Sequence, residues 1–69
     1  MAGTLTVRIG TPDAKAMRRY RYMWTVTRDG LTLGWGHTNR REEAETDAWD
    51  LISDHVAPED LGAVEVVGA

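Results

Sequence analysis

Two alternating segments on either side of Asp29 and Gly30 restrict this chain to a fold built around a β-hairpin. In residues 19–27, aromatic and branched side chains alternate with Arg, Met and Thr, the period of a strand with one buried face. The Asp-Gly pair favours a two-residue type I′ turn, because both central positions need a positive φ. The turn sets the register. The residue pairs expected to face each other include Thr27–Thr32, Val26–Leu33, Thr25–Gly34 and Trp24–Trp35.

The flanking segments predict two further strands and a connection. Residues 4–9 alternate Leu, Val and Ile with Thr and Arg, the pattern of a half-buried strand. Residues 10–18 are expected to form a loop, with a short helical turn opening at Thr11 and Pro12 as the alternative. Residues 63–67 predict a last short strand. It either extends the sheet or pairs with another subunit through its exposed edge, so a homo-oligomer is an expected possibility.

A helix is predicted between the hairpin and the last strand. Asn39 is expected to cap it, because Glu42 follows at the spacing of a capping box, and Pro58 follows its end. Its apolar stripe is expected to comprise Ala44, Ala48, Leu51, Ile52, His55 and Val56.

The predicted fold is therefore α+β. It is a small antiparallel sheet of three to four strands with one helix packed on one face, in the order βββαβ, forming a single domain over residues 1–69. The expected core comprises Leu5, Val7, Ile9, Tyr22, Trp24, Val26, Leu33, Trp35, Ala44, Ala48, Leu51 and Ile52.

Composition limits the classes of function. The 69 residues contain no cysteine, so packing or a partner subunit must stabilise the fold. The start of the sequence does not resemble a secretory leader, and no apolar run approaches the ~18 residues that span a bilayer. We therefore expect a cytoplasmic protein without a membrane partner.

Charge is distributed unevenly along the chain. The net charge of -3 argues against a generic nucleic-acid binder, because such proteins are usually basic. However, residues 1–41 hold all eight Lys and Arg with two acids, and residues 42–69 hold nine acids with no Lys or Arg. The two parts of the chain therefore have opposite charge.

Residues suited to catalysis are few. Ser53 is the only serine, and its position two residues from His55 points the two side chains to different sides of the predicted helix. His37 and His55 are the only histidines, whereas a catalytic zinc needs three protein ligands. We expect no enzymatic activity, no cofactor and no metal site.

Acids recur on one side of the predicted helix. Their spacing of three and four residues forms an outward ridge without Lys or Arg between them. A solvated face usually mixes charges of both signs, so this acidic ridge indicates a docking surface for a basic protein partner, the alternative being a merely soluble surface. The acidic ridge comprises Glu43, Asp47, Asp50 and Asp54.

The face of the predicted sheet away from the helix is a second candidate surface. Arg and Thr gather on it, and in the predicted register no bulky residue covers Gly34 or Gly36. Strands with such side chains can enter the major groove of DNA, where Arg contacts phosphates or guanine and Thr contacts the thymine methyl. This predicts nucleic-acid binding as the alternative function. The residues are Arg8, Arg19, Arg21, Thr25, Thr27 and Thr32.

The order of strand, "WTVTRDG", strand, "GWGHTNRREEAE" and helix is similar to the small arm-type DNA-binding modules at the N-terminus of phage and mobile-element tyrosine integrases. The resemblance covers roughly residues 4–56, and it extends to small phage and actinobacterial proteins of the same pattern. It implies a three-stranded sheet that reads DNA with one face and packs a helix on the other. It also implies an accessory role in a phage or mobile element. The positions that would face DNA are Arg19, Arg21, Thr25, Thr27 and Thr32.

Overall fold

The structure is a computed structural model that describes residues 4–68, with only the backbone of Asp60. The predicted domain of residues 1–69 includes residues 1–3 and 69, which lie outside the described residues. The prediction that the start of the sequence does not resemble a secretory leader also includes residues 1–3. In chain order the elements are β1 (Leu5–Gly10), η1 (Ala16–Arg18), β2 (Tyr22–Arg28), β3 (Leu31–Thr38), α1 (Arg41–His55), η2 (Pro58–Asp60) and β4 (Val64–Gly68).

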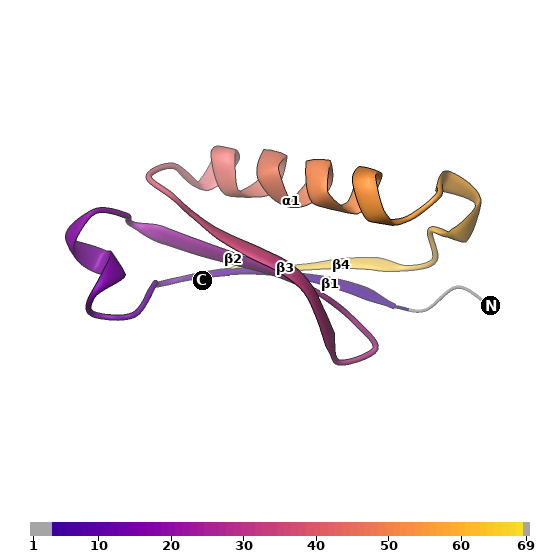
Figure 1. The fold of residues 1–69 in the computed structure, drawn as a ribbon, viewed down its shortest axis with the longest axis horizontal. Helices are drawn as coiled ribbons and strands as arrows, with labels where there is room; N and C mark the ends of the chain where they lie inside the picture. Colours follow the sequence, from indigo (N-terminus) through magenta and orange to yellow (C-terminus); the bar gives the residue numbers. More distant parts are fainter. Residues whose placement is uncertain (1–3, 69) are drawn as a thin grey trace.

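The molecule has two layers, a four-stranded sheet and α1 across one face of it (Figure 1). The sheet order is β3-β2-β1-β4, with β1, β2 and β3 antiparallel and β4 parallel to β1. The predicted α+β class and the order βββαβ are confirmed, although the fourth strand makes the sheet mixed. It extends the sheet of its own chain. Pairing with another subunit through the outer edge of β4 stays a prediction.

The core lies between the sheet and α1. It consists of side chains from β1, β2, one stripe of α1 and the C-cap residue Val56, as the alternation and the helical spacing predict. The buried apolar residues are Leu5, Val7, Ile9, Trp24, Val26, Ala44, Ala48, Ile52 and Val56, with Tyr22, Leu33, Leu51 and Val64 packed against them. Two predictions are wrong: His55 and Trp35 are exposed.

The turn of the hairpin is of the predicted kind. Asp29 and Gly30 have φ values of 50° and 88°, as a type I′ turn requires. Asp29 also joins the turn to the start of β1. The Thr4 N–H donates to Oδ1 of Asp29 at 3.2 Å, and the Asp29 N–H donates to the carbonyl of Thr4 at 3.2 Å. The turn residue thus aligns β1 with the hairpin.

The pairing of β2 with β3 follows the predicted register only next to the turn. Val26 faces Gly34, where the prediction had Leu33, because Leu33 is an extra residue in a β-bulge. Each later side chain of β3 consequently lies on the face opposite to the predicted one. Trp35 is 59% exposed, on the face away from α1. The prediction that Trp24 and Trp35 are neighbours under the helix is therefore wrong.

The bulge places two glycines where the core has no room for side chains. A Cβ on Gly34 would lie 2.7 Å from a terminal methyl of Leu51, and one on Gly36 would lie 2.7 Å from the indole of Trp24. The helix therefore approaches β3 at Gly34, and the Trp24 ring lies on the backbone at Gly36. The prediction that these glycines leave the opposite face uncovered is also wrong.

The helix begins later than predicted. Arg40 is the N-cap residue in an extended conformation, and no side chain caps the helix. Asn39 therefore precedes the N-cap position, and the predicted capping box with Glu42 is wrong. The hydroxyl of Thr38, a buried residue, donates instead to the carbonyl of Arg40 at 2.9 Å. Glu42 and Glu43 do lie in the first turn, where the helix dipole favours acids.

The connection between β1 and β2 is more ordered than a plain loop. Asp13 organises it, because its carboxylate accepts a hydrogen bond from the Ala16 N–H at 2.9 Å and its carbonyl accepts one from Met17 at 2.9 Å. The short helical turn η1 follows, later than the alternative start at residues 11–12. β2 then begins at Tyr22, so the predicted strand start at residue 19 is wrong.

Candidate functional site

The face of the sheet away from α1, here called the open face, carries side chains in rows that cross the strands. Residues that oppose each other in neighbouring strands share a face. The register therefore defines three rows. They are Thr32, Thr27, Thr6 and Glu65; then Trp35, Thr25, Arg8 and Val67; then His37, Met23 and Gly10.

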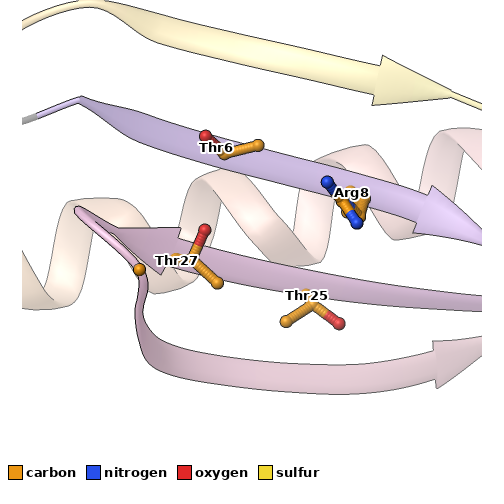
Figure 2. A pocket seen from close by; sticks show the side chains of 5 residues that line it. Thr6, Arg8, Thr25 and Thr27 are labelled. Atoms are coloured by element: carbon orange, nitrogen blue, oxygen red, sulfur yellow. The ribbon is translucent and has the colours of Figure 1, made fainter.

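Residues of the first two rows border a depression in the open face. It is lined by Thr6, Arg8, Thr25, Thr27 and Gly30. Figure 2 shows the four labelled side chains on one side of the sheet, with α1 behind it. Hydroxyl groups and one guanidinium therefore take part in an open surface that the helix does not cover. Arg8 is exposed and takes part in no ion pair with another described residue.

Three aromatic rings gather beside this depression. Tyr20 stacks on His37, with ring centroids 5.3 Å apart and planes at 21°. Trp35 meets His37 edge to face, with centroids 5.3 Å apart and planes at 80°. His37 is half-buried between the two rings, whereas Tyr20 and Trp35 are exposed. We call these three side chains the aromatic cluster.

The residues predicted to face nucleic acid are divided between two places. Arg8 and the three predicted threonines of β2 and β3 lie on the open face. Arg19 and Arg21 instead lie in the connection before β2, and both are exposed. This connection contacts the open face through Tyr20, which the two arginines flank in the chain.

The residues of the acidic ridge are on the other layer of the molecule. All four, Glu43, Asp47, Asp50 and Asp54, are exposed on α1. Within the described residues the one ion pair joins Arg41 to Glu45 at 3.7 Å, and both of its side chains are about half exposed. It therefore does not involve the ridge.

In the described part of the chain, no group of three or more His, Asp or Glu side chains is arranged to hold a metal ion. Ser53 and His55 are both exposed on α1. None of the helices between residues 4 and 68 is long and apolar enough to cross a membrane.

Sequence reasoning missed Thr6 and the aromatic cluster as parts of the open face. The cause for Trp35 and His37 is the bulge at Leu33, which reverses the faces of β3 after that residue. A signal was present in Gly34 and Gly36, because glycines at alternate positions in a strand often mark a bulge or a close approach. A prediction that placed both glycines on the helix side would also have placed Trp35 and His37 on the open face.

Comparisons with known proteins add no relative, because protein-family models, curated proteins and solved structures gave no significant match. The resemblance to arm-type integrase modules therefore stays a prediction.

Proposed function

We propose that this chain is a non-enzymatic module that binds nucleic acid with the open face of its sheet. The observation that supports this most is that the acidic ridge lies on the layer opposite to the open face. The helix layer presents the acidic ridge, whereas the open face presents Arg8 among hydroxyl groups. A polyanion can approach the open face without meeting the acids of the ridge.

The side chains of the open face suit the sugar-phosphate backbone. Arg and Thr are among the side chains that donate hydrogen bonds to phosphate oxygens, and such contacts position a nucleic acid. Arg8, Thr25 and Thr6 present these donors around one depression. Arg19 and Arg21 add two exposed cations in the connection before β2. Glu65, next to Thr6, is the one acid in the rows of the open face.

Binding to fluorescently labelled duplex and single-stranded oligonucleotides, measured by anisotropy over a range of salt concentrations, tests this function. The affinity is expected to fall as salt rises, with a slope of about -0.9 in log-log form per duplex phosphate contact. Because the open face and its flanking connection supply only three arginines, we expect few phosphate contacts and therefore a shallow dependence of affinity on salt. Changing Arg8, Arg19 and Arg21 to Ala is expected to abolish most of the binding.

A matched control removes the same charge elsewhere. Arg28, Arg40 and Arg41 are outside the rows of the open face, so changing all three to Ala is expected to weaken binding much less. Equal losses in the two triple variants would indicate attraction by net charge alone. Binding that is independent of salt would contradict the proposal.

A second candidate function is docking of a basic protein on the acidic ridge. It is supported by the exposure of all four acids and by their lack of ion pairs with described residues. Complementary charge mainly raises the rate of encounter, so neutralising the ridge is expected to slow association. The test compares protein capture by the native chain and the E43Q/D47N/D50N/D54N variant after nuclease treatment. Equal protein capture by the native chain and the variant would exclude the acidic ridge as a docking surface.

A further inference from the structure

One row of the open face combines an aromatic ring and a cation. Trp35, Thr25 and Arg8 face one another across β3, β2 and β1. Neighbouring strands lie about 4.8 Å apart, so the backbones at Trp35 and Arg8 are separated by about 10 Å. A polar hydroxyl lies between an exposed indole and an exposed guanidinium. A ligand that spans this row must offer both an aromatic or apolar face and an anionic group.

The aromatic cluster presents ring surface to solvent in a way that packing does not explain. Trp35 is 59% exposed and Tyr20 is 38% exposed, and both contact the half-buried His37. His37 thus holds two exposed rings at the same end of the open face. A single exposed aromatic residue is common on protein surfaces. A supported cluster beside a row of hydrogen-bond donors is instead typical of a surface that stacks flat rings.

The chemistry of the row distinguishes between kinds of nucleic acid. In a duplex the base faces are stacked on one another, and a protein reaches only base edges and phosphates. In a single strand the base faces are free to stack on Trp and Tyr, while phosphates contact cations nearby. A duplex would use Arg8 and leave Trp35 without a role, whereas a single strand uses both.

We infer that the open face binds single-stranded nucleic acid, with bases stacked on Trp35 and Tyr20 and the phosphate backbone held by Arg8 and the threonines of the depression. This inference rests on the proposed function and specifies its ligand. Arg19 and Arg21 lie on either side of Tyr20 in the chain, and both are exposed. The acidic ridge lies on the opposite layer.

The experiment measures the affinity of the native protein for three labelled oligonucleotides of about 12 residues, single-stranded DNA, single-stranded RNA and duplex DNA, by anisotropy. We expect a single strand to bind at least about tenfold more tightly than the duplex. We expect Trp35→Ala to weaken single-strand binding about ten- to hundredfold and to leave duplex binding unchanged. The preferred single strand identifies RNA or DNA as the ligand.

Trp49→Ala is the matched control, because Trp49 is also an exposed tryptophan but lies on α1. The affinity of the Trp49→Ala variant for single strands is expected to equal that of the native chain. A direct readout uses Trp49→Phe, in which Trp35 is the only exposed indole, since Trp24 is buried. A stacked base is expected to quench its fluorescence. Circular dichroism of each variant confirms that its fold is retained.

The outcomes separate this inference from the broader function. Equal affinity for the duplex and the single strands, together with an unaffected Trp35→Ala variant, would overturn the single-strand inference. If that binding still depends on salt and on Arg8, nucleic-acid binding by the open face stands. If none of the three oligonucleotides binds, both proposals are wrong.

Discussion

Trp24 and Trp35 lie in neighbouring strands but on opposite faces, so the same substitution is expected to have unequal effects. Trp24 is buried against α1, and its indole nitrogen has no hydrogen-bond partner among the described residues, so it stabilises the fold by packing alone. Trp24→Ala is expected to lower the free energy of unfolding by about 3–5 kcal/mol, and Trp35→Ala by less than about 1 kcal/mol. Urea denaturation followed by circular dichroism measures both. Similar losses would contradict the reversed face of Trp35.

A side chain added at Gly34 would meet different atoms from one added at Gly36. A methyl at Gly36 meets the rigid Trp24 ring at 2.7 Å, whereas one at Gly34 meets the end of the flexible Leu51 side chain at 2.7 Å. Gly36→Ala is therefore expected to cost about 1–3 kcal/mol and Gly34→Ala less, because Leu51 can rotate away. Gly10→Ala is the control, since its Cβ meets no atom within 4 Å. Melting temperatures rank the three variants. Equal melting temperatures for the two β3 variants would contradict the contact with Trp24.

At the scale of elements, the hairpin depends on its turn. Gly30 has a φ of 88°, which a β-branched residue adopts only with strain. Gly30→Val is expected to lower stability by about 1–3 kcal/mol, whereas Gly30→Asn is expected to cost less, because Asn tolerates positive φ. Thermal unfolding of both variants provides the measurement. If Val and Asn are equivalent, backbone strain is not the cause.

The bulge is the point beyond which the sequence did not predict the register of β2 with β3. Element types and most of the core followed from periodicity, because alternation and helical spacing report burial directly. The turn followed from the Asp29-Gly30 pair, which tolerates positive φ. The register beyond Thr27 did not follow, because Leu33 and Trp35 are both apolar and one extra residue exchanges their faces. The choice depended on the space available to Leu51 and Trp24, which only the tertiary structure reveals.

The candidate site was predictable to a lesser extent. Arg8 and the threonines were assigned to the open face because their strands keep a regular alternation up to the bulge. Arg19 and Arg21 were assigned to the sheet by extending that alternation past the start of β2. The contact of Tyr20 with His37 joins a connection to a strand, and no local periodicity encodes such a contact.

At the scale of the whole molecule, the acidic ridge places like charges at helical spacing on one layer. The E43Q/D47N/D50N/D54N variant is expected to be as stable as the native chain or slightly more so, because each like-charged pair costs a few tenths of a kcal/mol. Added salt is expected to reduce the difference. Glu42→Gln is the control for Glu43, because both acids lie in the first turn of α1, where the helix dipole favours a negative charge. Urea midpoints at two salt concentrations provide the test. A marked loss of stability on neutralisation would show that the ridge supports the fold.

The parallel pairing of β4 with β1 has a consequence for the order of folding. Leu5 pairs with Val64, so this pairing closes a loop of 64 − 5 − 1 = 58 residues, whereas Arg28 and Leu31 of the hairpin pair across 31 − 28 − 1 = 2 residues. Closing a long segment costs more entropy and is slower, so β1 gains its second neighbour late. Until then the edge of β1 is equally open to β4 of another molecule. Refolding at high protein concentration therefore favours dimers that have exchanged β4, and dilution favours the monomer.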